Sequence, residues 1–177
     1  MRRLIVALLA CLLAACGKPP VQQQESFVFG TRVEVLVADA DAEKAKRAAA
    51  AVLREFDRLH RTYHAWQASE LTALNASIAV ARPHRVSTEL AGFIVEAQAL
   101  AVAGERLFDP GIGALVRLWG FHGDEFGKSL PDPAALAAWR QAAPSIADLV
   151  VAVDGTVTSR KREVALDFGG YLKGVAL

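Results

Sequence analysis

An aspartate, a proline and two glycines stand close together in residues 108–121, which read FDPGIGALVRLWGF. Proline fixes φ beside Asp109, and glycine lets the backbone turn or approach a ligand closely. Such a rigid loop is suited to present a carboxylate and backbone groups to a ligand. The alternative is a turn in which Asp109 caps its own backbone, because an acid before proline is a common turn residue. We expect Trp119 and Phe121 to be core residues around the loop.

Residues 164–174, VALDFGGYLKG, contain a second group of this kind. Asp167 ends an apolar run, two glycines follow, and Lys173 comes shortly after them. Paired glycines leave backbone amides open to a pyrophosphate and carbonyls open to a cation, and lysine supplies a compact positive charge for phosphate. The alternative is a plain strand end that leads into a helix.

The histidines do not form a recognisable metal motif. His60 and His64 are four residues apart, but a catalytic zinc site needs a third protein ligand, and the sequence has no HExxH motif and no pair of cysteines at zinc-ligand spacing. His84 and His122 stand singly. There is also no GxSxG elbow, Walker loop or complete Rossmann fingerprint. We therefore expect neither a zinc enzyme nor one of these catalytic classes.

The two segments, FDP-x-x-G-x-L-V-x-L-W-G-F and D-F-G-G-x-x-K-G, resemble the ApbE family, the FAD:protein FMN transferases. Residues 29–31 (FGT) resemble the family's M-G-T, and residues 61–63 with 69–75 resemble its S-T-Y/W…S-E-L-x-x-L-N segment. Phe29 replaces methionine, Arg61 replaces serine, and Tyr171 and Leu172 replace small residues common in the glycine turn. Asn75 is expected to order its loop. The resemblance implies FAD contacts from Phe29, Tyr63, Leu107, Phe108, Asp109, Asp167 and Lys173, and a magnesium ligand from the backbone of Gly170.

The resemblance also implies a reaction. It is the magnesium-dependent transfer of FMN from FAD to a threonine hydroxyl of an acceptor protein, with release of AMP. Positioning and charge stabilisation would supply most of the catalysis, as in other phosphoryl transfers. Two alternatives stay open: an FAD pyrophosphatase that gives FMN and AMP, and a non-catalytic flavin-binding lipoprotein or inactive fragment. No catalytic base is assigned.

The resemblance covers only the N-terminal half of the family pattern. The downstream acidic and threonine metal ligands, the T-S-G turn and the histidine segment have no counterpart in the sequence. We expect a chain truncated at its C-terminus, with the activity belonging to a full-length parent. The 177 residues alone are expected to bind FAD weakly and without turnover.

The N-terminus predicts export and lipidation. Arg2 and Arg3 precede an apolar run over residues 4–13 that is too short to span a membrane, and residues 13–16 (LAAC) resemble a lipoprotein cleavage box. We expect a signal peptide over 1–15, a lipid-anchored polar tether over 16–26, and the N-terminal part of an ApbE-like domain over 27–177. Lipid on Cys16 would hold the protein in the bacterial cell envelope, facing the periplasm. A plain secretory signal is the alternative.

The numbers of basic and acidic residues indicate which kinds of partner the protein binds. Removing Arg2 and Arg3 from the 20 basic residues leaves 18 against 19 acidic residues. A nucleic-acid surface needs a dense basic patch, so we expect no nucleic-acid partner. The expected partners are the acceptor protein and, through the lipid, the membrane.

Periodicity predicts the elements that position these residues. Residues 27–37 alternate as in a half-buried strand, residues 149–153 and 156–158 form a hairpin, and residues 164–168 add a strand. Helices are expected after Asp39 or Asp41, from Ser87 to Gly104, and from Asp132 to before Pro144. The first helix should bury a stripe of Ala45, Ala48, Val52, Phe56 and Leu59. This order predicts an α+β fold in which a mixed or antiparallel sheet packs with helices.

Overall fold

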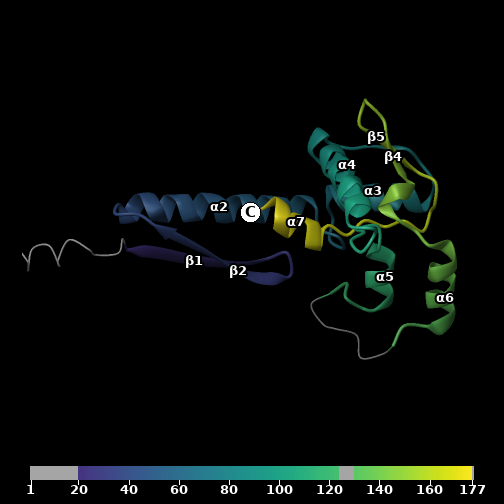
Figure 1. Ribbon diagram of the computed structural model, residues 1–177, viewed down its shortest axis with the longest axis horizontal. Coiled ribbons are helices and arrows are strands. Elements are labelled where there is room, and N and C mark those ends of the chain that lie inside the picture. The colour runs from purple at the N-terminus through teal and green to yellow at the C-terminus, as the bar shows by residue number, and fades with distance from the viewer. Residues whose placement is uncertain (1–19, 124–129, 177) are drawn as a thin grey trace, which may run out of the picture. The chain divides into compact units, whose positions relative to one another are not determined.

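The structure is a computed structural model that describes residues 20–123 and 130–176 (Figure 1). The chain divides into two compact units. One contains residues up to 27 together with 31–55, and the other contains 28–30 together with the chain from 56 onward. The predicted signal peptide over 1–15 and the lipidation site Cys16 lie outside the described residues. Within the described ranges, no helix combines the length and the apolar character needed to cross a membrane.

The first unit contains a β-hairpin and the start of a long helix. β1 (Val21–Val28) pairs with β2 (Thr31–Ala38), and their side chains mostly alternate between exposed and half-buried. α2 (Ala42–Thr62) begins where the carboxylate of Asp41 accepts a hydrogen bond from the backbone N of Lys44 at 3.0 Å. This cap confirms the predicted start of the helix.

Three predictions for this region need correction. The polar tether expected over residues 16–26 is wrong over residues 21–26, because they belong to β1. Its glutamines carry little strand propensity, which hid the strand. The single strand expected over 27–37 is a hairpin. Phe29 and Gly30 have φ of 54° and 70°, as a two-residue type I′ turn requires. In α2, Ala49 is buried, whereas Ala48 and Val52 of the predicted stripe are exposed.

The second unit is built on two helices and a small sheet. α3 (Glu70–Ala79) contacts β3 (His84–Arg85) and β5 (Thr156–Ser159), while α4 (Thr88–Ala103) contacts β4 (Leu149–Val151) and the short 3-10 helix η1 (Ile146–Asp148). The sheet is antiparallel with strand order β3-β5-β4. The predicted 149–158 hairpin and the predicted Ser87 and Gly104 caps of α4 are therefore confirmed. The core includes Leu71, Leu74, Ile78, Leu90, Ile94, Ile146 and Val157.

Three further helices complete this unit. α5 (Gly113–Leu118) contacts α6 (Pro133–Ala142), which starts at the predicted Asp132 cap. α7 (Gly169–Val175) begins within the paired glycines. The strand expected over 164–168 is wrong: the segment is extended but forms only one isolated parallel bridge, between Ile112 and Ala165. The α+β fold class with antiparallel strands is confirmed.

Candidate functional site

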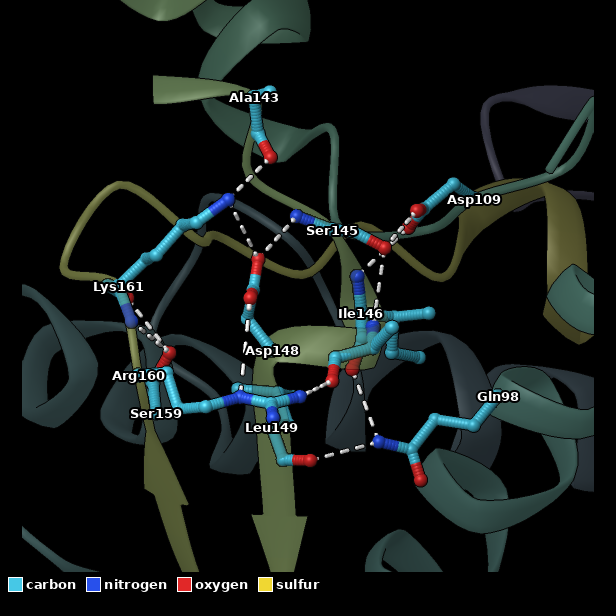
Figure 2. A network of polar contacts seen from close by, with 11 residues as sticks. Gln98, Asp109, Ala143, Ser145, Ile146, Asp148, Leu149, Ser159, Arg160 and Lys161 are labelled. Carbon is cyan, nitrogen blue, oxygen red and sulfur yellow. Dashed lines mark hydrogen bonds and ion pairs between the residues drawn. The ribbon is translucent and has the colours of Figure 1, made fainter.

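Asp109 fixes the loop that follows α4 to the start of η1. Its Oδ1 accepts a hydrogen bond from the backbone N of Gly111 at 2.8 Å. Oδ1 also accepts one from Ile146 N at 2.9 Å, and Oδ2 accepts one from Ser145 Oγ at 2.5 Å (Figure 2). Both carboxylate oxygens are therefore bonded within the protein. This is the capping role left open as the alternative for Asp109, extended to a second segment of the chain.

A wider network holds the η1 end of this contact (Figure 2). Asp148 accepts a hydrogen bond from Ser145 N at 3.1 Å and forms an ion pair with Lys161 Nζ at 3.3 Å, and Lys161 also donates to Ala143 O at 2.8 Å. Gln98 of α4 donates to the carbonyls of Ile146 and Leu149, both at 3.0 Å. Gln98 of α4 and Lys161, which follows β5, thus fix the segment around Ser145 and Ile146 that bonds to Asp109.

The glycines of the 108–121 segment are required by close approach rather than by a ligand. A Cβ on Gly111 would lie 2.5 Å from Ile146 N, and a Cβ on Gly113 would lie 2.8 Å from Ala165 O. Both distances are far below van der Waals contact, so these positions admit no side chain. Trp119 and Phe121, expected in the core, are instead 40% and 49% exposed.

The segment 164–168 lies between two anchors. On one side, Ala165 O accepts from Gly113 N at 2.7 Å, and Asp167 N donates to Pro110 O at 2.8 Å. On the other side, the amide of Asn75 pairs with the backbone of Leu166, at 2.9 Å to its O and 2.7 Å to its N. Asn75 therefore orders this part of the chain, as expected. The two motifs, which are far apart in sequence, are joined side by side.

Asp167 stands between two pockets. Its Oδ1 accepts a hydrogen bond from Gly169 N at 2.9 Å, and no group of the described residues donates to its Oδ2. The first pocket, of about 50 Å³, is lined by Phe29, Gly30, His60, Tyr63, His64, Ala65, Trp66, Asp167, Gly169 and Leu172. The second pocket, of about 300 Å³, is lined by Leu107, Phe108, Asp109, Pro110, Ile112, Val116, Asp167, Gly170 and Tyr171.

Most of the predicted site residues border these two pockets. Phe29 and Tyr63 line the first, whereas Leu107, Phe108, Asp109 and Gly170 line the second, and Asp167 lines both. Lys173 is exposed on α7 and is in the lining of neither pocket. Asp109 and Asp167 therefore line one pocket together, whereas Lys173 does not line it. FAD contact at each position stays a prediction.

Two tyrosines of the site are bonded to carboxylates of α4. The Tyr63 hydroxyl donates to Glu89 Oε2 at 2.5 Å, and the Tyr171 hydroxyl donates to Glu96 Oε2 at 2.7 Å. Arg58 also donates to both oxygens of Glu89, at 2.9 and 2.7 Å. Burial and the neighbouring carboxylate raise the pKa of each tyrosine, while the Arg58 hydrogen bonds lower the pKa of Glu89.

The hydrogen bonds of Glu89 and Glu96 to the two tyrosines were not predictable from the sequence. The first-turn position of Glu89 indicated only a favourable interaction with the helix dipole. The spacing of Glu89 and Glu96 does place them on one helix face, but it does not reveal the tyrosines that they meet. Only the difference between Tyr171 and the small residues of the family turn marked that position as unusual.

The histidines serve the local backbone. His60 Nδ1 accepts from Phe29 N at 3.3 Å, and His64 Nδ1 accepts from Trp66 N at 3.3 Å and Gln67 N at 3.2 Å. The two rings lie 4.8 Å apart. Burial lowers the pKa of His122; Arg117 adds to this effect, and Asp167 opposes it.

Magnesium fits the described residues poorly. It prefers six oxygen ligands in octahedral geometry. In residues 20–123 and 130–176 no three His, Cys, Asp or Glu side chains gather as a metal group. Asp167 Oδ2 is the accessible carboxylate oxygen beside Gly170, whose backbone is exposed and has open space where a Cβ would stand. These groups alone do not make a magnesium site.

Comparison with known proteins places this geometry in a family. The model of the ApbE family matches residues 29–177. A protein of Rhodobacter capsulatus named FAD:protein FMN transferase is 36% identical over 178 aligned residues, which cover 97% of this chain and 34% of that protein. Among solved structures, the ApbE protein of Thermotoga maritima matches with a TM-score of 0.79 at 24% identity, over 89% of this chain and 50% of that one. The flavin transferase ApbE of Vibrio cholerae, as an H257G mutant, matches with a TM-score of 0.70 at 23% identity, over 89% and 53%. The chain therefore spans about a third of the curated relative and about half of these structures.

Proposed function

The chain belongs to the ApbE family, and we propose that it holds FAD for the transfer of FMN to an acceptor protein. One observation carries the proposal: Asp167 lies between two pockets whose linings include six of the other predicted FAD and metal positions. The relative that shares 36% of its residues is named for this reaction. An FAD molecule has a pyrophosphate between two ring systems, and the second pocket, of about 300 Å³, is the larger of the two spaces beside Asp167.

The proposed reaction joins FMN to a threonine of the acceptor. The threonine oxygen forms a bond to the phosphorus next to riboflavin, the bond from that phosphorus to the AMP phosphate breaks, and the hydroxyl proton is released. The contribution of the described residues is positioning. The hydrogen bonds of Asp109 hold the loop that lines the second pocket, and Pro110 and Gly113 bind that loop to the segment that carries Asp167.

Magnesium dependence is part of the proposal through family resemblance. When bound, the ion would neutralise pyrophosphate charge. Since the described residues offer only the Asp167 carboxylate and backbone at Gly170, we expect Mg²⁺ without FAD to leave the melting temperature of this chain unchanged. Titrating MgCl₂ and then EDTA during thermal unfolding tests this. A saturable rise in melting temperature with Mg²⁺ alone would show that the chain carries a complete metal site.

The place of action is proposed from the N-terminal sequence. Lipid on Cys16 after removal of residues 1–15 would hold the protein at the cell envelope, facing the periplasm. Mass spectrometry of the protein from its host membranes, compared with a Cys16→Ser variant, tests this assignment. Lipid on the wild-type N-terminus and none on the variant is the expected result.

The function is tested with FAD and a threonine-containing acceptor. FAD binding by the 177-residue chain is measured by quenching of flavin fluorescence. Transfer is measured with the full-length parent and Mg²⁺, as the mass of FMN on the acceptor together with equimolar AMP. With Mg²⁺ present, Asp167→Asn keeps the oxygen that accepts from Gly169 N but removes the charge that would help to hold the ion at the pyrophosphate. The fold should therefore persist while FAD affinity falls about tenfold. Glu105→Gln, an exposed glutamate beyond the pockets, is the control and should bind FAD like wild type.

The outcomes separate the candidate activities. FMN on the acceptor with released AMP supports transfer. Free FMN and AMP without a labelled acceptor would replace the proposal with FAD pyrophosphatase activity. FAD binding without either product would leave a flavin-binding protein, and a chain that binds no FAD would contradict the proposal entirely.

A further inference from the structure

A third pocket lies apart from the two that border Asp167. It has a volume of about 650 Å³, and its lining comes mainly from α3, from α5 and from the chain at residues 162–165. Sites for small molecules commonly have volumes of this order. We call it the α3–α5 pocket. It shares no lining residue with the second pocket and only Ala65 and Trp66 with the first, so a ligand in it would not occupy the space proposed for FAD.

Small side chains on two helices leave this space open. One face of α3 lines the pocket with residues at positions i, i+3, i+4 and i+7, which are Thr72, Asn75, Ala76 and Ala79. α5 contributes Ala114 and Arg117. The alanines end at Cβ and are too short to fill the space between the helices. The hydrogen bonds of Asn75 with Leu166 hold α3 to the segment that lines the pocket at residues 164–165, so the pocket is formed before a ligand binds.

The pocket carries positive charge without an acid to balance it. Arg117 and Arg162 line it, and the described residues of its lining include no aspartate or glutamate. Over residues 20–123 and 130–176, neither arginine has a hydrogen-bond or ion-pair partner, whereas Arg58 and Arg61 are paired with carboxylates. The guanidinium group presents a planar set of donors that matches the oxygens of a phosphate or a carboxylate. Two such groups suit a ligand with two negative charges.

His122 places an unsatisfied polar group in the same wall. Its Nδ1 is buried and has no hydrogen-bond partner in the part of the chain that the structure describes. Its ring contacts Trp66 edge-on, with the centroids 5.2 Å apart, and both side chains line the pocket. Burial lowers the pKa of His122, and the charge of Arg117 adds to this effect, which means that the guanidinium group lies near the ring. A neutral imidazole therefore stands beside the positive charge of the pocket.

We propose that the α3–α5 pocket is a second ligand site, separate from the two pockets beside Asp167, and that it binds a small organic dianion through Arg117 and Arg162. The charged end of the ligand is a phosphate monoester or a pair of carboxylates, since either carries the two negative charges that two guanidinium groups balance. Its body is apolar and contacts Trp66 and the alanines of α3 and α5. The inference concerns a different site from the proposed function and does not depend on it.

The test uses phenyl phosphate and phthalate, which join the same ring to the two kinds of dianion. Binding to the full chain is measured by calorimetric titration at low salt, because salt screens contacts between accessible charges. We expect saturable binding of at least one of them with Kd of about 1 mM or below, and the tighter one identifies the charged group. Inorganic phosphate and phenol, which are the anion and the body alone, should bind at least about tenfold more weakly. No saturation by either dianion up to about 10 mM would overturn the proposal, and so would equal affinity for phenol.

Arginine variants locate the bound ligand. Arg117→Gln and Arg162→Gln should each weaken the tighter dianion about tenfold, because each loses hydrogen bonds between charged groups. Arg117→Lys keeps the charge without the planar donors and should lose less affinity than Arg117→Gln. Arg140→Gln is the matched control, since it removes an exposed arginine of α6 that is not in the lining of this pocket. Equal losses in Arg140→Gln and in the pocket variants would mean that the dianion is attracted to the chain without a site.

The titration of His122 gives a readout that does not rely on affinity. Its Cε1 proton, assigned by comparison with His122→Asn, is followed by nuclear magnetic resonance as pH changes. A bound dianion should raise the pKa of His122, because negative charge favours the imidazolium form. Arg117→Gln without ligand should also raise this pKa, since one of the causes that lower it is removed while the opposing Asp167 stays. An unchanged pKa of His122 at saturating dianion would place the ligand elsewhere on the chain.

Titrations with FAD separate this site from the proposed function. The dianion should bind with similar affinity in the absence and in the presence of saturating FAD. Arg117→Gln should leave the affinity for FAD unchanged, because Arg117 lines neither pocket beside Asp167. Competition between FAD and the dianion would overturn the separate site. A chain that binds the dianion but not FAD would defeat only the proposed function, and a chain that binds FAD but not the dianion would defeat only this inference.

Discussion

At the scale of single residues, side chains form hydrogen bonds with backbone groups that a neighbouring strand would otherwise pair with. The amide of Asn75 donates to Leu166 O and accepts from Leu166 N, so it pairs with that residue as a neighbouring strand would. The carboxylate of Asp109 likewise joins two loops through backbone N–H groups. Such residues stabilise the surroundings of the pockets.

Asn75→Ala should lower the free energy of unfolding by about 2–4 kcal/mol. The substitution leaves the N–H and the carbonyl of Leu166 unpaired, and Leu166 is only 1% exposed. Each unsatisfied buried group costs about 1–3 kcal/mol. Urea unfolding measures the loss. Asn75→Asp keeps the acceptor and loses the donor, so its free energy of unfolding should lie between those of wild type and Asn75→Ala. A loss below about 0.5 kcal/mol in Asn75→Ala would contradict the role of Asn75.

Gly113→Ala and Gly92→Ala should change stability in opposite directions. A Cβ on Gly113 meets Ala165 O at 2.8 Å, so the variant must separate the two motifs and should lose about 2 kcal/mol. A Cβ on Gly92, inside α4, has nothing within 4 Å, so alanine there should add about 0.5–1 kcal/mol through helix propensity. The measurement is the midpoint of thermal or urea unfolding for each variant. Equal changes in stability for the two variants would mean that the close contact at Gly113 does not limit the size of that residue.

At the scale of elements, α4 supports the site without lining either pocket. It begins at a serine cap, contacts η1 and β4, holds η1 through Gln98, and bears Glu89 and Glu96, which accept hydrogen bonds from Tyr63 and Tyr171. Its buried face and caps were predictable from apolar spacing and from Ser87 and Gly104. The face that bears Glu89 and Glu96 was not, because these carboxylates meet tyrosines that lie 26 and 75 residues away in the sequence.

The stability that Glu89 contributes should depend on pH below its ordinary pKa of 4.5. The Arg58 hydrogen bonds lower the pKa of Glu89 in the folded protein. The contribution is therefore present above 4.5 and is lost as pH falls through the lower folded pKa. The stability difference between wild type and Glu89→Gln should be constant near neutral pH and shrink toward about pH 3. Urea unfolding across this range checks it, and Glu105→Gln should show no such trend; a difference that grows in acid would reverse the assignment.

The sequence patterns predicted helices and strands better than they predicted which residues pair with them. Alternation and caps gave α4, α6 and the β4–β5 hairpin, because these signals are local. The same alternation in residues 164–168, where Val164, Leu166 and Phe168 are buried, indicated a strand. Alternation reports an extended, half-buried backbone, and it does not reveal whether the pairing groups come from another strand or, as here, from Asn75 and Pro110.

The positions of site residues were predictable where they lie in turns whose backbone the motif itself makes rigid. Asp109, Asp167 and Gly170 lie together because both motifs are rigid turns that contact one another. Lys173 was expected with them, yet it is exposed on α7 and lines neither pocket. A lysine side chain is long and flexible, so its sequence position says little about where its charge lies.

At the scale of the whole molecule, both pockets are formed by one of the two compact units. Their linings come from residues 29–30 and from the chain beyond 56, all within the second unit. The rest of the β1–β2 hairpin and the first part of α2 contribute no lining residue to either pocket. Ligand binding should therefore act on the two units differently.

FAD should protect amide hydrogens of the second unit selectively. At a free concentration near 100 times its dissociation constant, a ligand stabilises the folded state by about 2.7 kcal/mol. Hydrogen exchange with mass spectrometry should show slower exchange in residues 60–66, 107–113 and 165–172. Residues 31–55 should exchange at the same rate with and without FAD. Equal protection across the chain would contradict the assignment of both pockets to one unit.

The extended segment 164–168 also bears on self-association. Its backbone groups are occupied on both sides, by Asn75 at Leu166 and by Gly113 and Pro110 at Ala165 and Asp167. A free strand edge offers a row of unpaired N–H and C=O groups that recruits strands from other chains and seeds aggregates. This segment offers no such row at Ala165, Leu166 and Asp167, so a strand of another chain cannot pair with it there while these contacts remain intact.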